Sequence, residues 1–178
     1  MTMDPTRIEI QALDSEGFRA AIPGLAALTV DAVERGSGVN FLAGATTAET
    51  GAWWTARTDL VDAGVITVFV ARDGERVVGS TLIERSTNAN SPHRAEIGKV
   101  IVLRSYRRRG IGAALMRAAE ARARIDGRWL LILDTVAGSA AEAMYRDLGW
   151  TAFGVVPNHA LLPDGTPAAT TYFWKDLR

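Results

Sequence analysis

Three arginines followed by two alternating glycines form the part of the sequence whose residue types most directly suggest chemistry. The segment reads Arg107-Arg108-Arg109-Gly110-Ile111-Gly112-Ala113 and lies between a β-branched run and a segment of helical periodicity. The first N–H groups of a helix lack partners within it, and the helix dipole places partial positive charge there. Glycines allow a diphosphate to approach those N–H groups, and guanidinium groups suit phosphate oxygens. The segment therefore predicts a diphosphate-binding turn.

Other interpretations of this turn remain open from the local string. Its Gly-x-Gly spacing lacks the third glycine of a dinucleotide-binding fingerprint and the Lys-Ser/Thr pair of a P-loop. A basic surface turn that only caps a helix would use the same residues. Nucleic-acid binding is disfavoured, because 20 basic residues are balanced by 20 acidic ones and no other basic surface is predicted.

Two carboxylates, Glu96 and Asp134, are candidate general bases. Asp134 directly follows the apolar run Leu130 to Leu133 at the C-terminal end of a predicted strand, where α/β sites usually open. Glu96 lies near the start of the preceding predicted strand. If these strands are neighbours, both carboxylates could face one pocket and attract a cationic group, and each would raise the pKa of the other. A helix-capping role for Asp134 and a solvated position for Glu96 are the alternatives.

Tyr145 and two histidines are the other side chains with catalytic potential. Tyr145 shares a helix face with Met144 and Leu148, so it is either a core tyrosine or a general acid. His93 and His159 are weaker candidate bases, because lone histidines are more often surface residues. With two histidines, no cysteine and no paired spacing, we expect no metal site.

Hydrophobic periodicity predicts the elements that must position these residues. Helices are expected over about 14–35, with a break or kink at Pro23-Gly24, and over 46–64, 111–125 and 139–148. Strands are expected over about 7–13, 65–71, 77–84, 96–103, 129–133, 150–156 and 168–175. Asp73-Gly74 indicates a hairpin. The order predicts one mixed α/β domain over residues 1–178.

The composition limits the classes of protein to which the chain can belong. The chain has 178 residues, 48% of them hydrophobic and 22% charged, which suits one well-buried core. Its net charge of zero gives no reason to expect nucleic acid or an anionic membrane as partner. The N-terminus lacks an apolar core of signal-peptide length, and no apolar stretch is long enough for a transmembrane helix. The absence of cysteine fits a cytoplasmic location.

Two motifs resemble the signatures of the GNAT superfamily of N-acetyltransferases. The turn at 107–113 is similar to the family's acetyl-CoA-binding motif, and 141–150, ending in Tyr145, Leu148, Gly149 and Trp150, is similar to its second signature. Within the superfamily, Leu133-Asp134-Thr135, the 137–143 string and the tail from Leu162-Pro163-Asp164-Gly165 to Thr171-Tyr172-Phe173 are similar to the tabtoxin-resistance type. The resemblance implies a single GNAT-like domain, with a mostly antiparallel mixed sheet of about six or seven strands and about four helices.

The resemblance also implies a cofactor site and a mechanism. It implies acetyl-CoA as cofactor and direct attack of an amine on its thioester, with Tyr145 as acid and Glu96 and Asp134 as bases. The implied cofactor-binding residues are Val100, Ile101, Val102, Arg107, Arg108, Arg109, Gly110, Ile111, Gly112, Ala113, Ser139 and Tyr145. The backbone N–H of Val102 is the candidate donor to the acetyl oxygen. Many members have asparagine where this chain has Gly138, so we expect the Ser139 hydroxyl to replace its contribution.

The expected activity is acetylation of a primary amine on a small molecule, such as an amino-acid-like antibiotic or toxin. Phe41, Trp53, Trp54 and Asn158 are the candidate substrate-binding residues, and a bulky aromatic wall favours a small acceptor. The alternatives are a protein or peptide N-terminal acetyltransferase and a non-catalytic module that senses acetyl-CoA. Apolar strands near the C-terminus are compatible with a homodimer, and neither nucleic acid nor a membrane is expected as partner.

Overall fold

The computed structural model describes residues 8–178 as seven strands and five α-helices around one sheet. The strands are β1 (Glu9–Ala12), β2 (Ile66–Asp73), β3 (Arg76–Arg85), β4 (Arg94–Val102), β5 (Leu130–Val136), β6 (Thr151–Leu161) and β7 (Pro167–Asp176). The helices are α1 (Ser15–Glu34), α2 (Thr47–Thr55), α3 (Thr58–Asp62), α4 (Ile111–Ile125) and α5 (Ala140–Asp147), with a 3₁₀ turn at Arg104–Tyr106. The predicted α/β class and mostly antiparallel sheet are confirmed.

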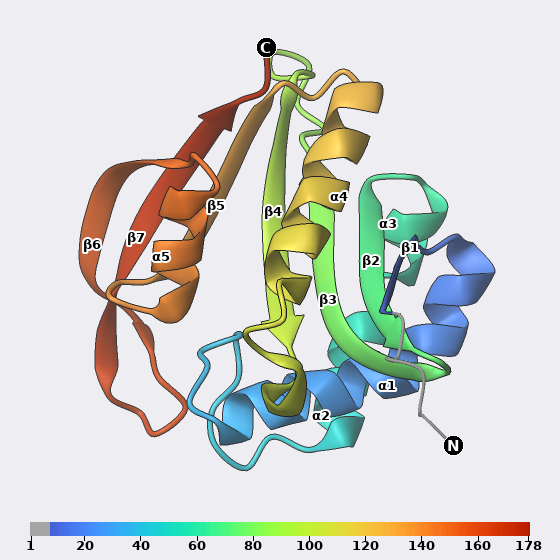
Figure 1. The fold of residues 1–178 in the computed structure, drawn as a ribbon, viewed down its shortest axis with the longest axis vertical. Helices are drawn as coiled ribbons and strands as arrows, with labels where there is room; N and C mark the ends of the chain where they lie inside the picture. Colours follow the sequence, from blue (N-terminus) through green and yellow to red (C-terminus); the bar gives the residue numbers. More distant parts are fainter. Residues whose placement is uncertain (1–7) are drawn as a thin grey trace.

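The sheet has the strand order β1-β2-β3-β4-β5-β7-β6. Every neighbouring pair is antiparallel except β4 and β5, which are parallel and joined by α4 as a crossover (Figure 1). The hairpin predicted at Asp73-Gly74 joins β2 to β3, and Gly74 has a φ of 57°, which a glycine adopts without strain. The sheet is therefore divided into two largely antiparallel halves that meet along one parallel pair.

Two hydrophobic cores cover opposite faces of the sheet, and β2 shows how one strand serves both. Val68 and Val70 pack in the core beneath α1 and α2, whereas Phe69 and Ala71 pack in the core beneath α4. This alternation is the period of two expected for a strand that is buried on both sides. We call the two sides of the sheet the α1 face and the α4 face, and α5 lies on the α4 face beside β5 (Figure 1).

Three expectations about the elements were wrong in detail. The first helix is not broken at Pro23-Gly24 but continues through both residues as α1. Gly24 lets α1 approach the sheet closely, because a Cβ there would lie 2.9 Å from Val77 Cγ2. The second predicted helix is divided into α2 and α3 at Ala56 and Arg57, which accounts for five helices in place of about four. The last two strands are longer than predicted.

The strand β6 forms one edge of the sheet and carries exposed apolar side chains. Phe153 is 59% exposed and Val155 is 57% exposed. The predicted homodimer remains a prediction. Within the part of the chain that the structure describes, no helix is long and apolar enough to span a membrane.

Candidate active site

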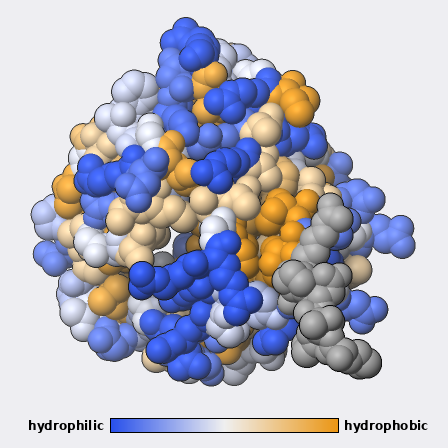
Figure 2. Space-filling view, viewed as in Figure 1, coloured by the Kyte–Doolittle hydropathy of each residue, from blue (hydrophilic) through white to orange (hydrophobic). Residues whose placement is uncertain are grey.

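The parallel strands β4 and β5 pair at one end only. Their register ends where Glu96 lies opposite Ile132, although β4 continues to Val102 and β5 to Val136. The two strands therefore lie side by side at one end and apart at the other (Figure 1). The space-filling view shows a hollow between α5 and the segment that leads into α4 (Figure 2). The diverging end of β4 thus presents its backbone to a cleft.

A β-bulge in β4 changes the side to which its residues point. Ala95 and Ile97 belong to the core on the α4 face, so Glu96 between them points to the α1 face. The register against β3 then shifts just before Ile101, and Lys99 at this position has a φ of 53°. A bulge adds one residue to one strand and re-aims its side chains. Lys99 consequently lies on the α1 face, as Glu96 does.

Asp134 reaches the same face from β5. Its neighbours Leu131 and Leu133 pack in the core on the α4 face, so Asp134 points the other way, and its register partner on β7 is Tyr172. Partial burial of its carboxylate group and then the charge of Asp134 raise the pKa of Glu96 above its ordinary value, although the residue as a whole is exposed. The structure therefore brings the two predicted carboxylates together on one face of the two strands that diverge.

Lys99 is a site residue that the sequence analysis missed. Its Nζ donates a hydrogen bond to Asn40 Oδ1 at 2.7 Å and lies 4.5 Å from the centroid of a Trp53 ring. Burial first, and then the charge of Arg57, lower the pKa of Lys99 to about 8, although Asp134 and Glu96 oppose that change. The charge of Lys99 is therefore influenced by the carboxylate pair and by a second cation, Arg57, without direct contact with an acidic residue.

Tyr145 lies on the opposite face, in α5. Its side chain is 4% exposed and packs against Phe173 and Trp150, with ring centroids 6.0 Å and 6.4 Å away. Burial, with a smaller contribution from Asp134, raises its pKa well above the ordinary value. The core role that the sequence allowed is therefore present, whereas the role of general acid remains a prediction.

The glycine turn precedes α4 as predicted, and its two glycines are required for different structural reasons. Gly110 is the N-cap residue with a φ of 78°, and no side chain caps the helix. The first N–H groups of α4 are thus left without a side-chain partner. A Cβ on Gly112 would lie 3.0 Å from Met144 Sδ, so this glycine allows α4 to pack on α5. Ile111 is buried in the core, which leaves only its backbone at the turn, whereas Ala113 is half-buried.

The three arginines of the turn are exposed, and Arg107 is tied to β4. Arg107 Nε donates to the carbonyl oxygen of Val102 at 3.0 Å, and Arg109 Nη2 donates to the Ser105 carbonyl at 3.1 Å. Arg108 has a φ of 61°, a left-handed conformation that is uncommon outside glycine. The charged groups therefore surround the uncapped end of α4.

The N–H of Val102 points into the cleft. Leu103 donates its N–H to the Val78 carbonyl at 2.9 Å, so the preceding N–H faces away from β3, towards the side from which β5 has diverged. Ile101 is buried beneath α1 and Val100 packs against the core under α4. The backbone of these residues, rather than their side chains, is accessible to a ligand in the cleft.

The Ser139 hydroxyl serves as the N-cap of α5. It accepts a hydrogen bond from the Glu142 N–H at 3.2 Å and lies 3.3 Å from Thr135 Oγ1. Gly138 before it has a φ of 76°, and its N–H bonds to the Glu142 carboxylate. Glycine adopts this left-handed conformation without strain.

The predicted aromatic wall consists of two residues rather than three. Phe41 and Trp53 are half-buried and in edge-to-face contact, with ring centroids 6.5 Å apart. Trp54 is 0% exposed and donates its Nε1–H to Thr29 Oγ1 at 3.1 Å within the core beneath α1. Trp54 therefore packs against Trp53 from the core, with ring centroids 5.0 Å apart, and offers no surface to a ligand.

The remaining candidates lie apart from one another. Asn158 is exposed in β6 with a φ of 53°, and His159 lies in the same strand rather than in a loop. His159 Nε2 lies 2.8 Å from the Tyr172 hydroxyl, which connects it to the register partner of Asp134. His93 stacks on Trp129 with ring centroids 4.3 Å apart, before the start of β4. Of the two histidines, only His159 is linked to the carboxylate face.

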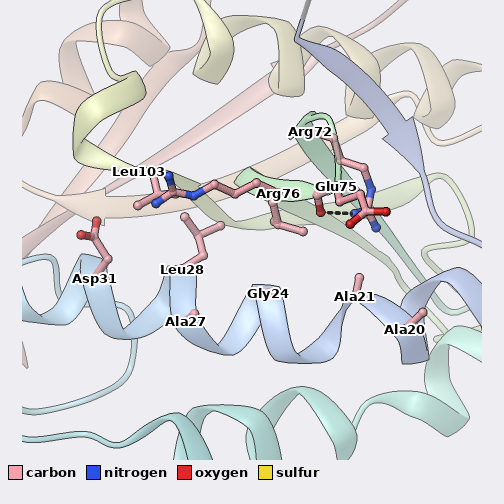
Figure 3. Close-up of a pocket in the computed structure, with 11 residues that line it drawn as sticks. Ala20, Ala21, Gly24, Ala27, Leu28, Asp31, Arg72, Glu75, Arg76 and Leu103 are labelled. Atoms are coloured by element: carbon pink, nitrogen blue, oxygen red, sulfur yellow. Dashed lines mark hydrogen bonds between the residues drawn. The ribbon is translucent and has the colours of Figure 1, made fainter. Parts of the chain in front are cut away.

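A separate groove of about 410 Å³ lies between α1 and the β2–β3 hairpin. Figure 3 shows small side chains such as Ala27 on the helix, with Arg72, Glu75 and Arg76 above them. Arg72 Nη1 donates to the backbone carbonyl of Glu75 at 3.1 Å. The groove does not include the carboxylate pair, so we do not assign the reaction to it. No group of three or more His, Cys, Asp or Glu residues within 8–178 is placed to hold a metal ion.

Together, a mixed sheet that opens at one parallel pair and an uncapped helix beside that opening define an acyltransferase of the N-acetyltransferase type. Residues 40–150 match the model of the Acetyltransferase (GNAT) family, and the chain belongs to this family. The match includes both the glycine turn and Tyr145. The family predicted from those two motifs is therefore confirmed.

Solved structures support the same fold over nearly the whole chain. An N-acetyltransferase from Staphylococcus aureus Mu50 has a TM-score of 0.78 and 17% identity, covering 97% of this chain and 99% of that one. The putative acetyltransferase yncA from Salmonella typhimurium, solved with its cofactor acetyl-CoA, has a TM-score of 0.75 and 20% identity, and the match covers 96% of this chain and 94% of that one. A ribosomal-protein-alanine N-acetyltransferase from Brucella melitensis has a TM-score of 0.73 and 25% identity, and the match covers 95% of this chain and 99% of that one. The first two likenesses show the fold alone.

Acetyl-CoA is the acetyl donor of this family, and the residues of the turn fit it. The uncapped N–H groups of α4, the bare N-cap Gly110 and the exposed arginines supply the donors and charge that a diphosphate requires. The open edge of β4 supplies backbone groups for an extended chain. The protein is therefore an acetyl-CoA-dependent acetyltransferase.

Proposed function

We propose that the protein acetylates a primary amine on a small molecule. The observation that carries this proposal is the position of Glu96 and Asp134 on one face of the two diverging strands. Two nearby carboxylates attract an ammonium group, and burial of one of them favours uptake of a proton. The amine must lose a proton before it can attack an acyl carbon. A carboxylate whose pKa is raised, as that of Glu96 is, accepts this proton more readily than an ordinary one.

The two sides of the opening have separate tasks in this proposal. Acetyl-CoA, when bound, supplies an activated acetyl thioester. The α4 turn holds the diphosphate through Arg107, Arg108, Arg109 and the N–H groups of residues 111–113. Val100, Ile101 and Val102 bind the extended arm through their backbone, and the Val102 N–H donates to the acetyl oxygen. The carboxylates on the α1 face orient the amine and accept its proton through water.

Tyr145 is the proposed proton donor to the leaving thiolate. Burial in α5 keeps its phenol protonated, because its pKa is raised above the ordinary value. A phenol, with an ordinary pKa of about 10, is a weaker acid than a thiol, with one of about 8.5, so the proton must pass to the sulfur as the C–S bond breaks and negative charge develops there. Ser139, next to the position that holds asparagine in many relatives, is assigned to cofactor contact because it begins the same helix.

A small acceptor is favoured over a protein substrate by the aromatic wall of Phe41 and Trp53, which borders the α1 face near Lys99. The motifs shared with the tabtoxin-resistance type point to an amino-acid-like antibiotic or toxin as acceptor, with Asn158 and the wall as contacts. A second candidate is a protein N-terminal acetyltransferase. It is favoured by the likeness to the ribosomal-protein-alanine N-acetyltransferase, at 25% identity.

An amine panel with mass detection of the product tests the proposal. The panel contains amino acids, amino-acid-like antibiotics, polyamines and peptides with free N-termini, each incubated with acetyl-CoA. We expect acetylated small molecules and little acetylated peptide. Acetylation of peptides alone would support the second candidate, and tight binding of acetyl-CoA without transfer to any amine would support a sensing module.

A further inference from the structure

Lys99 and Arg57 form a cationic cluster around Trp53 on the α1 face. The guanidinium carbon of Arg57 lies 3.1 Å from a Trp53 ring centroid, and Lys99 Nζ lies 4.5 Å from it. Arg57 Nη1 also donates to the Trp53 carbonyl at 2.8 Å, and Lys99 Nζ donates to Asn40 at 2.7 Å. Contacts with an aromatic face and one fixed hydrogen bond hold each cation in place.

Neither cation has an acidic partner in contact. Within residues 8–178, neither Lys99 nor Arg57 takes part in an ion pair. Glu84, Glu96 and Asp134 act on them only from a greater distance. Two sheltered like charges repel each other, and each retains N–H donors beyond the single bond that it makes. An anion that reached the free donors of both cations at the Trp53 ring would offset the repulsion.

We propose that Lys99 and Arg57 form a subsite for a carboxylate of the acceptor, so that the acceptor is an amine that also carries a carboxylate. This inference rests on the proposed function and specifies its substrate class. The acidic pair at Glu96 and Asp134 binds the ammonium end, and the cationic pair binds the acidic end. Because the bulge brings Lys99 to the same face as Glu96, the two opposite charges of a zwitterion would meet complementary groups on one face.

Pairs of acceptors that differ only in the carboxylate test this subsite. We would compare phenylalanine with phenylalaninamide and phenethylamine, and leucine with leucinamide and isopentylamine, measuring kcat and KM with acetyl-CoA. The amine of an amide is less basic and more often neutral, so intrinsic reactivity favours the amide. We nevertheless expect kcat/KM to be about 10- to 100-fold higher for the acid, the range expected for hydrogen bonds to a charged group.

Variants assign the preference to the cluster. Lys99→Met should raise KM for the acids by about tenfold more than KM for the amides, whereas Lys99→Arg should retain most of the preference. Arg57→Gln should act in the same direction, and it replaces Lys99→Met if that variant does not fold. Arg122→Gln is the matched control, because Arg122 pairs with Asp126 at 2.7 Å on α4. Melting temperature and KM for acetyl-CoA report on the fold and the cofactor site.

The outcomes separate this inference from the function on which it rests. Equal kcat/KM for acids and amides, or an equal loss of both in Lys99→Met, would overturn the carboxylate subsite and leave small-molecule acetylation standing. Acetylation of peptides with no turnover of any small amine would overturn both. Preference for the acids that disappears in Lys99→Met and returns in Lys99→Arg would support the subsite.

Discussion

Asp134 and Tyr145 approach the same opening from opposite faces of the sheet. Asp134 points to the α1 face from β5, and Tyr145 packs on the α4 face from α5. The charge of Asp134 nevertheless contributes to the raised pKa of Tyr145. At this level β5 is still paired with β7, but its pairing with β4 has already ended, so the sheet is open on the β4 side of Asp134.

Tyr145→Phe should lower kcat by about 100-fold, the effect typical of losing a general acid, with a small change in KM for the amine. The fold should be retained, because the Phe173 and Trp150 contacts involve only the ring. Since the pKa of Tyr145 is raised above 10.0, its deprotonation should cause no loss of activity below that pH. Steady-state kinetics from pH 6 to 10 checks both points. A kcat within about twofold of wild type would leave Tyr145 with its core role alone.

The pH dependence of kcat/KM should reflect the raised pKa of Glu96. A carboxylate must be ionised to attract the amine and accept its proton, so activity should rise with pH through a midpoint above the ordinary 4.5. The charge of Glu84 is one cause of that shift. Glu84→Gln should therefore move the midpoint to lower pH, whereas Asp126→Asn, on the far end of α4, should not move it. An unchanged profile in Glu84→Gln would contradict the assignment.

Glu96→Gln should make the protein slightly more stable while it impairs the reaction. A raised pKa in the folded protein means that folding disfavours the ionised form of this carboxylate relative to its neutral form. The stabilisation is therefore complete while the carboxylate is neutral, and it is lost as the pH rises through the folded-state pKa. At pH 7 the substitution removes this cost, by well under about 1 kcal/mol because the group is solvent-accessible. Urea denaturation at pH 4 and pH 7 should show the gain at pH 7 only. A gain of the same size at both pH values would argue against the charge as its source.

The glycine turn and the second motif were predictable because their chemistry is local. The turn needs a glycine at position 110 for its φ of 78°, and it needs an uncapped helix end directly after it. Both requirements are visible within a few residues of sequence. The reason for Gly112 was not visible, because the atom that excludes a Cβ there belongs to Met144, 32 positions later (144 − 112) in another helix.

Lys99 could not be predicted, because its orientation depends on the bulge. In a regular strand, residues 96 and 99 would point to opposite faces, since side chains alternate with a period of two. The register shift opposite Ser80 and Leu82 reverses that parity. A lysine in a strand also suggests a solvated position. The pairing of β4 with β3, rather than any local pattern, therefore brings Lys99 into the site.

Gly112→Ala should weaken use of acetyl-CoA by crowding the Met144 side chain between α4 and α5. The new Cβ would lie 3.0 Å from Met144 Sδ, and α5 also carries Tyr145. We expect a loss of less than about 1 kcal/mol in stability, because the flexible end of Met144 can move by the few tenths of an ångström required, and a several-fold higher KM for acetyl-CoA. Met144→Ala in the same chain should recover stability by making room. If KM recovers as well, packing explains Gly112. If stability recovers but the KM for acetyl-CoA does not, the close approach of the cofactor explains the requirement for Gly112 instead.

Glu120, Trp150 and Lys175 form a buried network whose loss should affect stability rather than chemistry. Glu120 is 5% exposed and accepts hydrogen bonds from Trp150 Nε1 and Lys175 Nζ, each at 2.9 Å. Lys175→Met leaves this carboxylate without its cation, so unfolding free energy should fall by about 3 kcal/mol. The double variant Glu120→Gln/Lys175→Met should lose less than the sum of the single variants, because the buried charge is gone. Urea denaturation gives the coupling energy, and activity per folded molecule should stay within about twofold of wild type. Additive losses would mean that Glu120 and Lys175 stabilise the fold independently.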